Sequence, residues 1–98
     1  MAWQIVIDFA LPADAAARSA LMYRIWIFGE DLYGAFRNGR QASVDLEEID
    51  RATDRICVRT IKNRQVRTVA GLIRKLLGRH HLEEVATLTE VKEGAPDT

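Results

Sequence analysis

The residues of this chain best suited to chemistry are a run of cations without acids. Eight Arg or Lys residues, and neither Asp nor Glu, lie between Arg55 and Leu82. Five of these cations lie around or within one expected helix: Lys62, Arg64, Arg67, Arg74 and Lys75. A helix N-terminus offers free backbone N–H groups and the positive end of the helix dipole, so cations around it strengthen anion binding. The pattern therefore indicates a site for a small anion or for an acidic protein partner.

The same cations have a plainer interpretation as solvated or internally neutralised surface. The chain is formally neutral, because residues 1–54 carry five basic and nine acidic residues and residues 83–98 carry one and five. Acids such as Asp45 and Glu47 are able to pair with the basic segment, and charged surface pairs contribute little to stability. Nucleic-acid binding is not favoured, because the segment lacks aromatic residues that stack on bases and a neutral chain has no strong attraction for phosphates.

No other residues form a recognised catalytic or metal-binding pattern. His80 and His81 are adjacent and have no second Cys/His cluster to complete a site, so no metal is predicted. Cys57 is the only cysteine and is expected to be a small buried residue or part of a subunit contact. Asp8, at the end of an expected strand, and Tyr33 are the groups available for proton transfer. No cofactor is predicted.

Length and composition indicate one domain over residues 1–92, followed by a flexible C-terminal tail over 93–98. A chain of 98 residues that is 48% hydrophobic is sufficient for one packed core. The single cysteine fits a reducing compartment, and the first residues do not resemble a signal peptide. We therefore expect a cytoplasmic protein without a membrane span, which needs roughly 20 apolar residues.

The first expected elements are a strand and a long helix. Trp3, Ile5, Ile7 and Phe9 alternate with other residues, which is the pattern of a strand with one buried face. Helical periodicity follows from Ala13 to Phe36, with an apolar arc of about half the circumference. The arc contains Ala17, Leu21, Met22, Ile25, Trp26, Phe28, Gly29, Leu32, Tyr33 and Phe36. A strand over Tyr23–Phe28 is the competing interpretation, and we prefer the helix.

A β-hairpin is expected next, with its loop at Arg51–Asp54. The apolar spacing changes from two to three at Glu47 and Glu48, which predicts a β-bulge there. The register that follows pairs Ile49 with Ile56, Leu46 with Val58 and Val44 with Thr60.

A second helix and a last strand complete the chain. The helix is predicted over Arg64–Leu77, with Asn63 as its N-cap and Gly78 as its C-terminal stop. The strand is predicted over Glu84–Val91, where Val85, Thr87, Thr89 and Val91 alternate with other residues. In this alternation, Ala86 and Leu88 lie on the opposite face of the strand.

The order of elements predicts an α+β fold of the ferredoxin-like β-α-β-β-α-β type, a four-stranded antiparallel sheet with two helices on one face. The open face then holds Val6, Cys57, Ala86 and Leu88, and covering this apolar surface predicts a homodimer through that face. We expect a non-enzymatic interaction module with a basic helix surface for an anionic ligand or acidic partner.

Two alternatives remain open. One is a small dimeric α+β-barrel enzyme with a pocket between sheet and helices, where Asp8 or Tyr33 transfers protons. The other is a nucleic-acid-associated protein.

Overall fold

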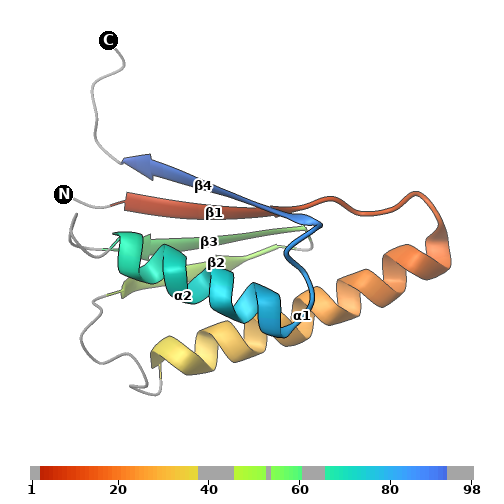
Figure 1. Cartoon of the computed structure of the whole chain (residues 1–98), viewed down its shortest axis with the longest axis horizontal. Coiled ribbons are helices and arrows are strands. Elements are labelled where there is room, and N and C mark those ends of the chain that lie inside the picture. Colours follow the sequence, from red (N-terminus) through yellow and green to blue (C-terminus); the bar gives the residue numbers. More distant parts are fainter. Residues whose placement is uncertain (1–2, 38–45, 53, 61–65, 93–98) are drawn as a thin grey trace, which may run out of the picture.

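The chain forms an antiparallel sheet with two helices packed on one of its faces (Figure 1). The computed structural model describes residues 3–37, 46–52, 54–60 and 66–92. The elements are β1 (Trp3–Phe9), α1 (Ala15–Arg37), β2 (Leu46–Arg51), β3 (Arg55–Thr60), α2 (Val66–Arg79) and β4 (Ala86–Lys92). The order across the sheet is β2-β3-β1-β4, and all neighbours are antiparallel. Neither helix, over these residues, has the length and apolar character needed to cross a membrane.

The expectation of a ferredoxin-like β-α-β-β-α-β fold with a four-stranded antiparallel sheet requires a correction. Wherever side-chain burial is described, the core is formed by a three-stranded antiparallel sheet, β3-β1-β4, and the two helices. β2 joins this sheet through its backbone, at the outer edge of β3 and with an irregular register. The expected core residue Val44, the side chains of Leu46 and Ile49, and the predicted tail at 93–98 lie outside what the structure describes.

The core lies between the sheet and the helices. In β1, Ile5, Ile7 and Phe9 are buried and the residues between them are partly exposed, as the alternation predicts. The buried side chains of α1 follow a three–four spacing: Leu21, Ile25, Phe28, Leu32 and Ala35. This spacing is one narrow stripe along a helix. The helix is therefore confirmed over the alternative strand at Tyr23–Phe28.

The β-bulge predicted in β2 is confirmed, but the predicted register is wrong by two residues. The irregularity lies between Leu46 and Glu48. The observed pairs are Leu46 with Thr60, Ile49 with Val58 and Arg51 with Ile56. The strand also includes Arg51, which was assigned to the loop. Because directly paired residues of neighbouring strands share a face of the sheet, Arg51 lies on the helix-facing side with its partner Ile56, which is buried.

The two faces of β4 are exchanged relative to the prediction. Ala86 lies opposite Phe9 and Leu88 opposite Ile7, so both pack against the core. Thr87, Thr89 and Val91 lie on the open face instead. A change of phase by one residue exchanges all side chains between the faces of a strand. The open face thus loses two of the four apolar residues on which the expected dimer contact depended.

α2 continues past its predicted stop at Gly78 and ends in a Schellman motif. The Leu82 N–H donates to the Leu77 carbonyl at 2.9 Å, and the His81 N–H to the Gly78 carbonyl at 3.2 Å. His81 has a φ of 56°, in the left-handed position that glycine usually occupies. Arg24 of α1 caps this end, because its Nη2 donates to the carbonyls of His80 and His81 at 3.0 and 2.7 Å.

His81→Gly should stabilise the fold. Glycine adopts the left-handed conformation without the steric cost of about 1–2 kcal/mol that other residues incur, and its greater freedom in the unfolded chain offsets part of that gain. We expect the free energy of unfolding in urea to rise by about 0.5–1 kcal/mol. His81→Ala retains a Cβ and is the control. An equal gain for both variants would contradict the role of the left-handed conformation.

Candidate docking groove between α1 and β2

α1 carries more apolar surface than the core buries. Beside its buried stripe runs a second row at helical spacing, which we name the α1 flank: Met22, Trp26, Gly29 and Tyr33. Trp26 is 56% exposed and Tyr33 37% exposed, and Tyr23, one turn from Trp26, is 64% exposed. The apolar arc identified in the sequence is therefore only partly buried.

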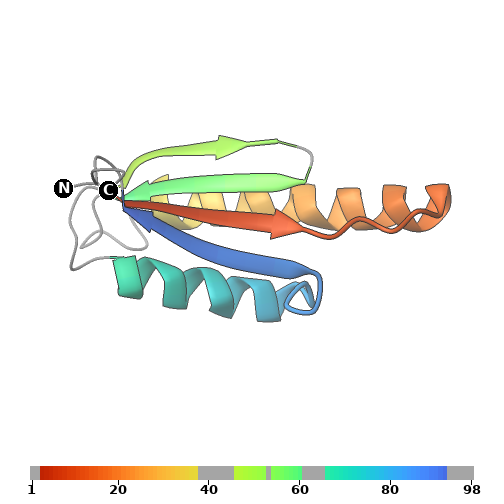
Figure 2. The same cartoon turned by 90° about the horizontal axis from the view of Figure 1, so that it is seen from above.

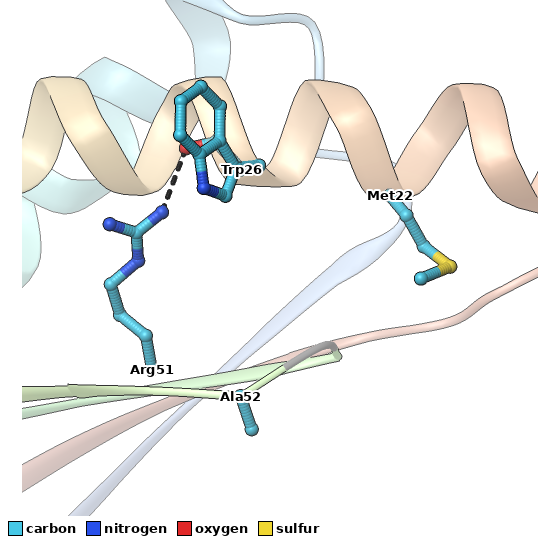
Figure 3. Close-up of a pocket in the computed structure, with 4 residues that line it drawn as sticks. All are labelled: Met22, Trp26, Arg51 and Ala52. Atoms are coloured by element: carbon cyan, nitrogen blue, oxygen red, sulfur yellow. Dashed lines mark hydrogen bonds between the residues drawn. The ribbon is translucent and has the colours of Figure 1, made fainter.

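The α1 flank forms one wall of a groove beside β2 (Figure 3). The groove has a volume of about 530 Å³ and is lined by Met22, Trp26, Arg51 and Ala52. Two of these residues come from successive turns of α1, and the other two from the end of β2 and the loop after it. Trp, Met and Arg are enriched at the centres of protein–protein interfaces. The composition of this groove is therefore typical of a docking site.

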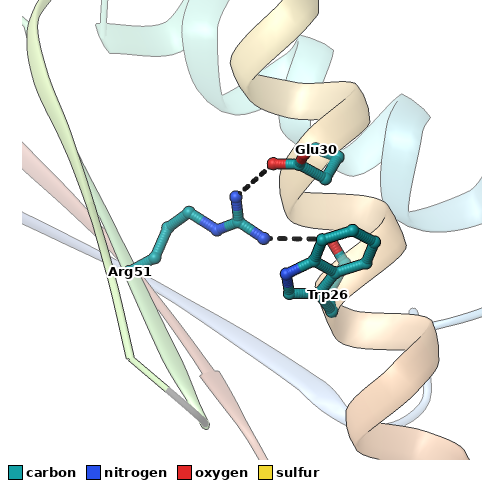
Figure 4. Close-up of polar contacts among 3 residues, drawn as sticks. All are labelled: Trp26, Glu30 and Arg51. Atoms are coloured by element: carbon teal, nitrogen blue, oxygen red, sulfur yellow. Dashed lines mark hydrogen bonds and ion pairs between the residues drawn. The ribbon is translucent and has the colours of Figure 1, made fainter.

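Arg51 connects β2 to α1 across the groove (Figure 4). Its Nη1 donates to Glu30 Oε2 at 2.5 Å, and its Nη2 donates to the main-chain carbonyl of Trp26 at 3.0 Å. The Arg51 side chain is 27% exposed, and that of Glu30 is 52% exposed. A planar guanidinium with two acceptors in fixed positions keeps one orientation. The groove therefore has a rigid polar side opposite an aromatic one.

Gly29 provides the space in which Arg51 lies over the helix. A Cβ built on Gly29 would lie 2.7–2.8 Å from the Nε, Nη2 and Cζ atoms of Arg51. Glycine in a helix interior costs roughly 1 kcal/mol relative to alanine, so the contact with Arg51 gives this residue a structural reason. From the sequence, Gly29 was placed only in the apolar arc of the expected helix. Its contact with Arg51 was not predicted, because the two residues are distant in the chain and the strand was expected to end before Arg51.

The predicted anion-binding residues are described only in part. Lys62 and Arg64 lie outside the described residues, so the structure does not define the predicted site at the N-terminus of α2. Arg67, Arg74 and Lys75 are exposed on α2, and over the described ranges they form no ion pair. A Cβ added to Gly71, on the same surface, would meet no atom within 4 Å, so this face of α2 is open to a partner.

The two expected proton-transfer groups are not brought together. Asp8 lies on the open face of the sheet, where its Oδ1 accepts a hydrogen bond from Arg55 Nε at 2.7 Å. This bond, together with the attraction between the two charges, raises the pKa of the Arg55 guanidinium. Tyr33 lies on α1, which covers the opposite face of the sheet. Asp8 is thus engaged in a cross-strand ion pair on the surface.

The two histidines lie at the C-terminal end of α2 and have different surroundings. His80 Nε2 lies 2.9 Å from Asp31 Oδ2 of α1, and its ring meets Phe28 edge to face at 5.8 Å. His81 is exposed. In the parts of the chain that the structure describes, no group of three or more His, Cys, Asp or Glu residues is arranged to hold a metal ion. The contact between His80 and Asp31 joins the two helices.

Gly29→Ala should stabilise the protein only when Arg51 has been truncated. In the wild type, the added methyl group displaces the guanidinium from Glu30 and from the Trp26 carbonyl, which offsets the gain in helix propensity. In an Arg51→Ala background, we expect the same substitution to raise the free energy of unfolding by about 1 kcal/mol. Urea unfolding of the four proteins measures the coupling, for which we expect about 1–2 kcal/mol. Additive effects would contradict the contact between Arg51 and Gly29.

Comparison with known proteins does not assign the groove to a family. No protein-family model matches the chain, and no curated protein matches its sequence. The interpretation of the groove depends on its geometry and on the chemistry of the residues that line it.

Proposed function

We propose that this protein is a non-enzymatic interaction module that docks a protein partner on the α1 flank and its groove. The observation that carries the proposal is Trp26, which is 56% exposed beside a groove whose other side is held in place by Arg51. Apolar surface left in water costs about 25 cal/mol per Å², and a partner that covers the indole recovers this free energy. Tryptophan is also among the residues most often found as a binding hot spot.

The lining of the groove indicates the chemistry of the partner. Trp26 offers a rigid aromatic surface, and the flexible thioether of Met22 adapts to the shape of an apolar group beside it. Arg51 and Glu30 provide one donor and one acceptor group next to this apolar surface. We therefore infer a partner that inserts an apolar or aromatic side chain, with polar groups next to it. Tyr23, exposed one turn from Trp26, extends the contact.

The alternative functions receive less support. A barrel enzyme would need an enclosed pocket within the core between sheet and helices, and the described core there is filled by side chains such as Ile5, Phe28 and Ile73, which are fully buried. A nucleic-acid site on the exposed aromatic residues would need several cations beside them, whereas Arg51 is the one cation among the described residues that line the groove, and it is paired with Glu30. A dimer through the open face is not part of the proposal, because Ala86 and Leu88 belong to the opposite face. The cytoplasm remains the proposed compartment.

Trp26→Ala should abolish docking without unfolding the protein. A photo-reactive benzoylphenylalanine in place of Tyr23, next to the groove, would crosslink the partner in cells that produce the full chain. We expect the yield of the crosslinked complex to fall about tenfold or more on Trp26→Ala, because a hot-spot tryptophan contributes about 2 kcal/mol or more. The thermal midpoint of unfolding should change little, because the Trp26 side chain is largely exposed.

The same photo-reactive residue at Thr68 is the matched control, because Thr68 is exposed on α2. Identical complexes from both positions would contradict the proposal. Capture from position 23 that persists after Trp26→Ala, or no capture from this position, would contradict it as well.

A further inference from the structure

The two edges of the sheet are built differently. β2 has a bulge and carries Glu47, Glu48 and Asp50 among its six residues. Bulges and charges are features that keep an edge strand from pairing with another chain. β4, at the other edge, pairs with β1 over seven consecutive residues without a register shift. Among the described residues no strand pairs with the outer side of β4, which Figure 2 shows at the opposite edge from β2.

Alternate residues of β4 direct their backbone groups away from β1. The Ala10 N–H donates to the Val85 carbonyl at 2.9 Å, in the same register as the pairs between β1 and β4. Successive residues of an antiparallel ladder bond to opposite sides, so Thr87 and the residues in phase with it bond to β1. The N–H and C=O groups of Leu88 and Glu90 therefore point to the outer edge, where an added strand would meet them.

A groove lies next to this edge, between β4 and α2. Its volume is about 310 Å³, and its lining consists of Arg74, Leu77, Glu83, Ala86 and Leu88. α2 and β4 run side by side in Figure 2. Domains that bind a peptide by strand addition combine an open strand edge with a groove for alternate side chains of the peptide. β4 and this groove provide both features.

The charge of α2 indicates which kind of strand fits. α2 carries Arg67, Arg74, Lys75 and Arg79 and no acidic residue. A second copy paired through β4 would bring its own basic α2 alongside, and like charges brought together at an interface are unfavourable. Arg67 and Arg74 are seven residues apart and share one face of α2, and Arg74 also lines the groove, so acidic groups of a bound segment are favoured along this row.

We propose that β4 binds an extended acidic segment of a partner protein as an additional β-strand. One apolar side chain of the segment occupies the groove between β4 and α2, and its acidic side chains meet Arg67 and Arg74. The site lies at the opposite edge of the sheet from the α1 flank, so it does not depend on the function proposed above.

The test uses a fluorescent peptide, Thr-Val-Thr-Glu-Thr-Val-Thr-Glu, and a counterpart with Lys in place of Glu, in anisotropy titrations with the full chain. We expect the Glu peptide to bind about tenfold or more tightly than the Lys peptide. Arg67→Glu combined with Arg74→Glu should reverse this preference. Binding of the Lys peptide by that variant would also demonstrate that it is folded. Trp26→Ala should leave the affinity unchanged, which separates this site from the α1 flank.

A second pair of variants tests the backbone hydrogen bonds between β4 and the added strand. Glu90→Pro removes an outward N–H and leaves the ladder with β1 intact, so it should weaken the Glu peptide about tenfold. Glu90→Ala keeps the N–H and should change the affinity about twofold at most. Amide exchange in the wild type gives a measurement that does not depend on any variant folding. The peptide should slow exchange at Leu88 and Glu90, whereas the Thr89 amide should already be protected in the free protein.

Three results would overturn the proposal. The first is equal affinity for the two peptides, or binding of neither. The second is unchanged amide exchange at Leu88 and Glu90 with the Glu peptide bound. The third is a dimer of the wild type that Glu90→Pro converts to a monomer, because a second copy would then occupy the edge.

Discussion

The burial of one narrow stripe of α1 against the sheet is the constraint on which the other features depend. Phe28, at the middle of this stripe, is fully buried and packs edge to face on Phe9 at 6.0 Å. A helix with a single buried stripe has a fixed rotation about its axis. The α1 flank must therefore face outward beside β2, because a rotation that buried Trp26 would withdraw Phe28 from the core. The exposure of Trp26 is therefore a consequence of how α1 packs on the sheet, and so is the position of the groove beside it.

Polar contacts made by α1 explain which charges of the chain are already engaged. Arg24 caps the carbonyls at the end of α2, and Asp31 meets His80 at the same end. Arg51 reaches α1 from β2 and bonds to Glu30 and to a main-chain carbonyl. These groups hold the helices and the edge strand together, so they contribute to structure. The exposed cations of α2 make no ion pair of this kind within the described ranges, and they therefore remain the charges best suited to an external partner.

Sequence periodicity predicted β1 and both helices, because each has one strongly apolar face. The change in apolar spacing also predicted the bulge in β2. It failed in β4, because Thr87 and Thr89 form as plausible a buried face as Ala86 and Leu88, and only the pairing with β1 selects the phase. The end of α2 was misplaced because the Schellman motif is completed by Leu82, buried beyond the helix, and not by a glycine. The α1 flank had a local signal in its wide apolar arc, but its groove did not, since it requires a tertiary contact between α1 and β2.

The two sheet edges differ in the part of the protein that a partner would meet. At the β2 edge, the bulge and the acidic residues disfavour backbone pairing, so recognition there depends on side chains of the α1 flank. At the β4 edge, the regular ladder directs backbone groups of Leu88 and Glu90 outward, where no described strand pairs with them, so recognition depends on the main chain and on the charge of α2. Two strands lie between these edges, which at the usual spacing are about 14 Å apart. β1 is hydrogen-bonded on both sides and fixes the distance between the edges. Partners docked at the two edges would therefore be held in one defined relative orientation.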